Sequence, residues 1–135
     1  MVVGEVVQTE RGSYVRCAPG SGVVANDRDL LTLLECSYEL EANRILLTAV
    51  QLHPDFFDLS TGLAGSLFVK LTNYRVQTAV VADLSAIKSQ RFQELIRESN
   101  RRGQIRYFNT VAEAEAWLLG ANSAKIDKKL SLSRK

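Results

Sequence analysis

Two hydroxyls and two carboxylates are the residues of this sequence whose types and spacing could do chemistry. Ser60 and Thr61 follow Asp55 and Asp58 in the run "DFFDLSTGLAGSLFVKL". Ser and Thr favour helix N-caps, because their side-chain oxygens accept hydrogen bonds from the free N–H groups of the first turn. A phosphoryl group on either hydroxyl would add about −1.5 to −2 charges and alter a docking surface. The run therefore predicts the start of a helix, and it leaves capping and docking open as uses of its hydroxyls.

Enzymatic chemistry is not favoured by the other reactive residues. Asp55 and Asp58 have no base or metal partner beside them in the sequence, as paired catalytic carboxylates would need. The histidine His53 and the cysteines Cys17 and Cys36 are too few for a structural zinc site, which takes about four ligands. We therefore expect a non-enzymatic domain without a metal or a cofactor, and we expect both cysteines to be small buried hydrophobes.

The residues around the two hydroxyls are the predicted docking surface. It comprises Asp55, Phe56, Phe57, Asp58 and Gly62, and an exposed pair of phenylalanines beside a helix start would form a binding patch. The alternative is that both phenylalanines form a lid over the edge of a sheet. The sequence leaves both interpretations open.

A second possible surface is basic. Arg97, Arg101 and Arg102 are the centre of an arginine-rich stretch, residues 91–106, that could contact RNA or an acidic partner. Glutamates at 94 and 98 interleave with these arginines, which favours an ordinary solvated helix face. Nucleic-acid binding is therefore the less favoured prediction.

Length and composition indicate one globular domain. The chain has 135 residues, of which 46% are hydrophobic and 24% charged, and its formal net charge is +2. No apolar run approaches the roughly 20 residues that span a bilayer, and the first residues do not form a signal peptide. We expect a cytoplasmic protein with an α/β domain over residues 1–120 and a polar, basic, flexible tail over residues 121–135.

The hydrophobic period divides the chain into alternating strands and helices. β-Branched and continuous apolar runs predict strands at 2–7, 13–17, 44–52, 76–84 and 104–108. Helical spacing predicts helices starting at Asn26 or Asp27 and spanning 61–73, 89–100 and 111–119, with Tyr38 on the apolar face of the first and Thr110 as the cap of the last. Strands that alternate with helices predict a mixed, mainly parallel sheet of about five strands, opened by an antiparallel hairpin.

The element order and the run "LSTGLAG" together resemble a known family, the STAS domains typified by bacterial anti-sigma-factor antagonists. The family has Asp-Ser-Ser-Gly-Leu at the start of its second helix, and Ser60, Thr61, Gly62 and Leu63 match its last four positions. Here Asp58 stands one residue earlier than the family's aspartate. Residues 23–118 also resemble a narrower bacterial family of STAS-like domains of unknown function.

The resemblance implies a regulatory role. In anti-sigma-factor antagonists a partner kinase phosphorylates the first serine, and the phosphate switches binding off. The candidate phosphoacceptors here are Ser60 and Thr61, and the implied partner is a serine kinase or an anti-sigma-type regulator. Helix N-termini carry free N–H groups that can stabilise a phosphate.

Two other functions stay open on the sequence. STAS-like folds can hold nucleotides or lipids, and Phe56, Phe57 and Tyr74 could line an apolar pocket for such a ligand. Homo-oligomers could also form, by pairing of an edge strand from the opening hairpin or from "YRVQTAVV", residues 74–81.

Overall fold

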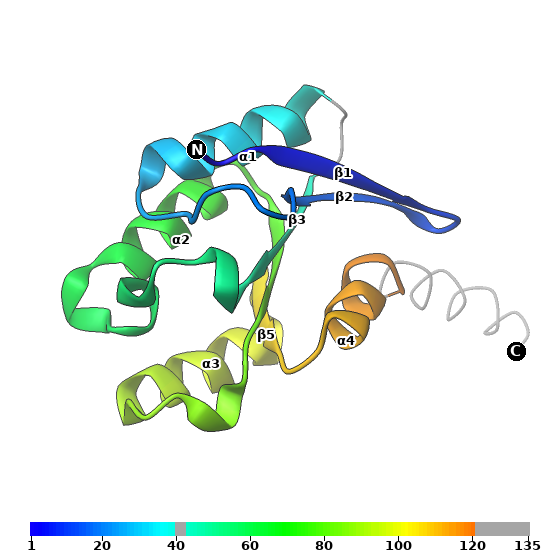
Figure 1. Cartoon of the computed structure of the whole chain (residues 1–135). Coiled ribbons are helices and arrows are strands. Elements are labelled where there is room, and N and C mark those ends of the chain that lie inside the picture. Colours follow the sequence, from blue (N-terminus) through cyan, green and yellow to red (C-terminus); the bar gives the residue numbers. More distant parts are fainter. Residues whose placement is uncertain (40–42, 121–135) are drawn as a thin grey trace, which may run out of the picture.

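A five-stranded sheet organises the domain, and it confirms the predicted fold class. The computed structural model describes residues 1–39 and 43–120 (Figure 1), so the predicted tail lies outside the described residues. The strands are β1 (Gly4–Thr9), β2 (Gly12–Cys17), β3 (Arg44–Thr48), β4 (Gln77–Val81) and β5 (Ile105–Phe108). They lie side by side in sequence order, with β1 antiparallel to β2 and the remaining neighbours parallel.

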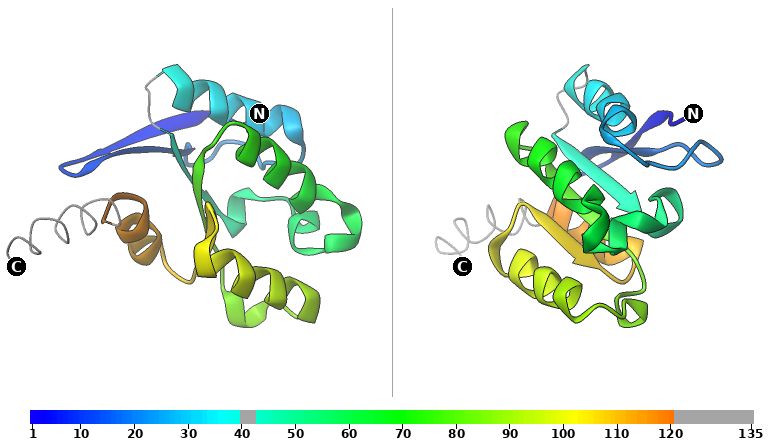
Figure 2. Two further views of the ribbon diagram at one scale, coloured as in Figure 1. Left: turned by 180° about the vertical axis from the view of Figure 1, so that it is seen from behind. Right: turned by 90° about the vertical axis from the view of Figure 1, so that its left-hand side faces the viewer.

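The helices divide between the two faces of the sheet. The helices α1 (Asp27–Glu39), α2 (Leu63–Asn73) and α3 (Gln90–Arg102) cover one face, and α4 (Val111–Glu115) covers the other (Figure 2). Each crossover between parallel strands is right-handed, and the strand order always advances in the same direction across the sheet. The three crossover helices therefore lie on the same face of the sheet. A π-helix, Ala116–Gly120, continues α4 without a break.

Each face has its own hydrophobic core, because the parallel strands bury both of their sides. Leu33 of α1, Leu67 of α2 and Phe92 of α3 share one core with Ile45 on the first face, all with zero exposure. The second core is smaller. It contains Tyr14, Leu46, Ala79, Val81, Ala114, Leu118 and Leu119.

Side-chain caps fix three helix starts as the sequence predicts. The amide N–H of Asp29 donates to Asn26 Oδ1 at α1, and that of Phe92 donates to Ser89 Oγ at α3. At α4 the amide of Glu113 donates to Thr110 Oγ1. Each cap satisfies one of the free N–H groups of a first helical turn.

Three local predictions on the sheet and α1 were wrong. The strand expected over residues 76–84 ends at Val81, and a 3₁₀ turn, Leu84–Ala86, follows it. The strand expected to reach residue 52 ends at Thr48, because the next residues form a 3₁₀ turn, Ala49–Gln51. The side chain of Gln51 accepts from the Thr48 hydroxyl and donates to the carbonyl of Cys17, which ties this turn to the end of β2. Tyr38 is 81% exposed, because the buried stripe of α1 runs through Ser37 instead.

Candidate functional site

The predicted site lies where the parallel strands end. The long connection from β3 to α2 winds through three 3₁₀ turns, Ala49–Gln51, Pro54–Phe57 and Leu59–Thr61, and the β2–α1 loop runs beside it. A one-residue parallel bridge joins these loops: the amide of Val24 donates to Gln51, and the amide of His53 donates to Val24. The connection that carries the hydroxyls is therefore fixed, near its start, to the β2–α1 loop.

Asp58 holds Ser60 in a tight turn. Its Oδ1 accepts from the Ser60 amide at 3.0 Å and from the Ser60 hydroxyl at 2.7 Å. These two bonds, the hydroxyl first and the amide second, hold the pKa of the Asp58 carboxyl below its usual value. The hydroxyl of Ser60 is exposed and hydrogen-bonded to a carboxylate.

The hydroxyl of Thr61 has a different position. It lies 2.7 Å from the carbonyl oxygen of Asp55 and 2.8 Å from that of Asp58, so carbonyl groups of two successive turns share its proton. Its oxygen also accepts from the amide of Leu63 at 3.3 Å. Thr61 therefore joins the two turns to the start of α2.

The start of α2 differs from the prediction by two residues. The helix begins at Leu63, and Gly62 precedes it with φ 81° and ψ −4°, a left-handed conformation that glycine adopts without strain. Neither hydroxyl is thus the N-cap residue itself. The predicted cap was wrong in position, because Asp58 already fixes Ser60 in the preceding turn.

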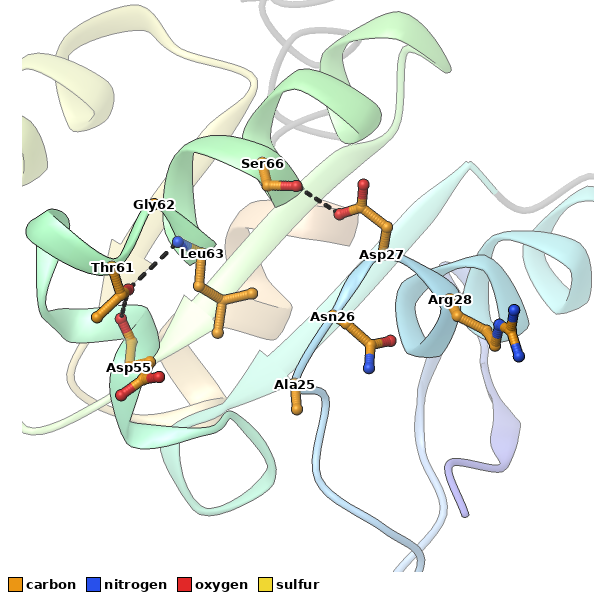
Figure 3. Close-up of a pocket in the computed structure, with 9 residues that line it drawn as sticks. All are labelled: Ala25, Asn26, Asp27, Arg28, Asp55, Thr61, Gly62, Leu63 and Ser66. Atoms are coloured by element: carbon orange, nitrogen blue, oxygen red, sulfur yellow. Dashed lines mark hydrogen bonds between the residues drawn. The ribbon is translucent and has the colours of Figure 1, made fainter.

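An open hollow of about 670 Å³ separates the starts of α1 and α2. Figure 3 shows Thr61, Leu63 and Ser66 on one side of it, with Asn26 and Arg28 on the other. Asp27 spans the two helices, because its Oδ1 accepts from the Ser66 hydroxyl at 2.6 Å. The α1 side of this hollow could not be predicted, since nothing in the local sequence patterns links residues 25–28 to residues 61–66.

The two phenylalanines do not form the exposed patch that the docking surface assumed. Phe56 is 1% exposed, and Phe57 is half-buried against the core. The ring of Phe56 packs at 5.0 Å from Phe57, 5.8 Å from Phe68 and 6.0 Å from Phe92. Of the two interpretations that the sequence leaves open, the structure favours the lid, because the turn Pro54–Phe57 points its rings at α2 and α3 rather than at solvent.

The remaining members of the predicted docking surface are exposed. Asp55, Asp58 and Gly62 lie at the surface with both hydroxyls. Tyr74, the third residue proposed for an apolar pocket, follows the last residue of α2, whereas the phenylalanines precede its first. The structure therefore does not bring these three rings together into one pocket.

The end of the sheet at which these loops lie also differs from the usual ligand crevice of an α/β sheet. Such crevices form where the strand order reverses, so that helices on opposite faces diverge. In the described sheet the order runs from β1 to β5 without reversing. The candidate site is thus an exposed set of loops rather than a deep cleft.

The arginine surface has mixed charge, as the sequence indicates. Arg97 and Arg101 are exposed on α3, and Arg101 lies 3.7 Å from the Glu98 carboxylate. Arg102 ends the helix, and its side chain lies outside the described part of the chain. Arg106 is on the other face of the sheet, where its guanidinium stacks 5.0 Å from the centre of the Trp117 ring.

A second copy of the Asp58 turn follows the neighbouring strand. In the sequence "DLS" occurs at 58–60 and again at 83–85. Asp83 Oδ1 accepts from the Ser85 amide at 3.2 Å and from the Ser85 hydroxyl at 2.7 Å, as Asp58 does with Ser60. This repeat is visible in the sequence and indicates that the same turn follows both strands.

A comparison with protein families assigns the chain. The family described as "Domain of unknown function (DUF4180)" matches residues 9–118. The chain belongs to this family. The match covers every strand and helix of the DUF4180 domain from the end of β1 to the π-helix. No curated protein and no solved structure matches the chain.

Two further observations apply to the described residues of this DUF4180 domain. None of their helices is long and apolar enough to cross a membrane. Over the same residues, His, Cys, Asp and Glu side chains do not gather in groups of three that could hold a metal ion.

Proposed function

We propose that this DUF4180 domain is a non-enzymatic regulatory module of STAS type that docks a protein partner. The docking surface is the β3–α2 connection from Asp55 to Gly62 together with the start of α2. The observation that carries the proposal is the exposed Ser60 hydroxyl, held by Asp58 on a turn of the connection that backbone hydrogen bonds join to the β2–α1 loop. A fixed turn presents the same surface to every partner, so docking costs little conformational entropy.

Phosphorylation of Ser60 would switch this surface. Asp55 and Asp58 already give the turn two carboxylates, and a phosphoryl group would add about −1.5 to −2 charges beside them. The phosphate would also replace the hydroxyl proton that Ser60 donates to Asp58, so repulsion would open the turn. We therefore assign the phosphate the role of releasing a docked partner.

Ser60 is a better phosphoacceptor than Thr61. The proton of the Thr61 hydroxyl is engaged with backbone carbonyls that join the two 3₁₀ turns, so its transfer would disturb the turns themselves. The Ser60 hydroxyl contacts only the Asp58 side chain among the hydrogen bonds found in the described residues. Local structure thus favours Ser60, although both residues are exposed.

The matched turn at Ser85 provides the control for the test. We would immobilise the wild type and the variants Ser60→Ala, Ser60→Asp and Ser85→Asp, and identify by mass spectrometry what each retains from a lysate of the producing cell. We expect one partner to bind the wild type, Ser60→Ala and Ser85→Asp, and to be lost from Ser60→Asp. Retention of the same proteins by Ser60→Asp and the wild type would contradict the proposal.

The modification itself needs a separate measurement. Incubation with a serine kinase from the same cell, followed by phosphopeptide mapping, should place phosphate on Ser60 and leave Ser85 unmodified. Equal labelling of both serines would mean that the kinase recognises any exposed serine in a "DLS" turn. That result would refute the proposal that the kinase recognises the docking surface.

A further inference from the structure

The free edge of β1 is open to another strand. Along a strand of an antiparallel pair, residues alternate. One residue forms hydrogen bonds to the neighbouring strand through its backbone N–H and C=O groups, and the next residue points these groups away from that strand. The amide of Ala18 donates to the carbonyl of Val3 at 2.8 Å, which fixes the phase of this alternation along the β1–β2 register. Gly4, Val6 and Gln8 are consequently the residues of β1 whose backbone groups point out of the sheet.

These outward groups have no partner in the part of the chain that the structure describes. The hydrogen bonds of its turns and side chains do not include the backbone of Gly4, Val6 or Gln8. The β1–β2 hairpin extends past the other strands (Figure 1), and Gln8 is exposed near its tip. The strand also lacks lysine and proline, which natural proteins place on edge strands to prevent pairing.

The opposite edge of the sheet is closed by a side chain. Asn100 of α3 donates from Nδ2 to the carbonyl of Tyr107 at 3.1 Å and accepts at Oδ1 from the Tyr107 amide at 2.7 Å. This side-chain amide occupies the outward backbone groups of Tyr107, which a further strand would need on β5. The predicted pairing through residues 74–81 is wrong, because β4 lies inside the sheet between β3 and β5.

We propose that β1 pairs antiparallel with β1 of a second copy of this chain, which joins two sheets into one of ten strands. An antiparallel pair of identical strands has a twofold axis, and the outward residues restrict where it can lie. With the axis at Val6, Gly4 faces the partner's Gln8 and Val6 faces its own copy, so all three outward residues form hydrogen bonds.

Charge excludes a neighbouring register. Moving the axis to Glu5 would place two glutamates directly opposite each other, and like charges at opposed positions of a sheet are destabilising. With the axis at Val6, Glu5 instead lies opposite Val7 of the partner and keeps its own partner Arg16, whose Nη2 is 2.6 Å from the Glu5 carboxylate. Val6 and Val15 are neighbours on one face, so the pairing extends an apolar row across the axis.

A proline at an outward position tests the pairing without breaking the monomer. Proline lacks the N–H group, and edge strands tolerate it where that N–H faces solvent. Gln8→Pro therefore removes a donor that only the dimer uses, whereas Gln8→Thr keeps the donor and serves as the control. Sedimentation equilibrium over a wide concentration range would give the mass of each protein, with residues 1–135 all present.

We expect the wild type and Gln8→Thr to approach twice the monomer mass and Gln8→Pro to stay at the monomer mass, with far-UV spectra unchanged. Amide exchange in the wild type should slow at Val6 as concentration rises, while Val7, already bonded to β2, stays equally protected. A wild type that is monomeric throughout the range would overturn the proposal. A Gln8→Pro variant that dimerises like the wild type would overturn it as well.

Discussion

Two buried tyrosines should respond in opposite ways to the same substitution. Tyr14 is 2% exposed and Tyr107 is 1% exposed, so each loses one hydroxyl from the interior on mutation to Phe. The hydroxyl of Tyr14 donates to the Glu115 carboxylate at 2.7 Å and thereby ties the end of α4 to the sheet. The hydroxyl of Tyr107 lies among aromatic rings and has no hydrogen-bond partner in the described residues.

The magnitudes follow from these surroundings. A hydrogen bond to a charged group contributes about 1.5–3 kcal/mol, so Tyr14→Phe should lower the free energy of unfolding by about 2 kcal/mol. A buried polar group without a partner costs about 1–3 kcal/mol, so Tyr107→Phe should raise it by about 1 kcal/mol. The two variants should then differ by about 3 kcal/mol, although both remove a single oxygen atom from a buried ring.

Urea unfolding of the wild type and both variants measures this difference. The midpoint should fall for Tyr14→Phe and rise for Tyr107→Phe, and the slope should not change, because neither variant alters the surface exposed on unfolding. A fall of about 1 kcal/mol or more in the free energy of unfolding of Tyr107→Phe would refute the reasoning, because removing a hydroxyl that has no hydrogen bond should not destabilise the fold. It would mean that this hydroxyl is hydrogen-bonded in solution.

Three further outcomes are expected. Burial, and then Glu115, raises the pKa of Tyr14 to about 12, and burial also raises the pKa of Tyr107. Unfolded tyrosines lose their protons near pH 10, so the free energy of unfolding in urea should fall above that pH, by up to about 1.4 kcal/mol for each tyrosine and each pH unit. A stability that does not change with pH in this range would contradict the expectation. Burial raises the pKa of Cys17 to about 11. A thiol reagent near neutral pH should therefore modify half-buried Cys36 first, and Cys17 only as fast as the protein unfolds. Mass spectrometry that finds Cys17 modified before Cys36 would contradict this expectation. Asn100→Ala leaves two backbone groups of Tyr107 unpaired and should cost about 1–3 kcal/mol in urea unfolding, whereas an unchanged midpoint would show that water replaces the amide.

The order of elements could be predicted from the sequence, because each strand and helix carries its own period. Continuous apolar runs marked the parallel strands, and Asn26, Ser89 and Thr110 marked helix starts. Boundaries were missed where a side chain bonds to a distant backbone group. Gln51 ends β3 by reaching the carbonyl of Cys17, a contact between residues that are far apart in the sequence.

The candidate site could be located but not drawn in detail. The hydroxyls of residues 60 and 61 were expected at the start of a helix, and they lie in the turn that precedes α2. The burial of Phe56 could not be predicted, because it depends on where Phe68 and Phe92 lie in space. The segment "DFFDLS" is too short for its pattern of apolar and polar residues to indicate which ring faces inward.

The strand order of the sheet has a consequence for how the chain folds as it leaves the ribosome. Each strand of the sheet lies next to the strand that was synthesised just before it. The hairpin can close first, and each later strand then adds to the edge that its predecessor has just formed, with 23 to 28 residues of connection between parallel neighbours. No strand has to wait for a distant part of the chain, and the growing edge closes when Asn100 and β5 emerge together.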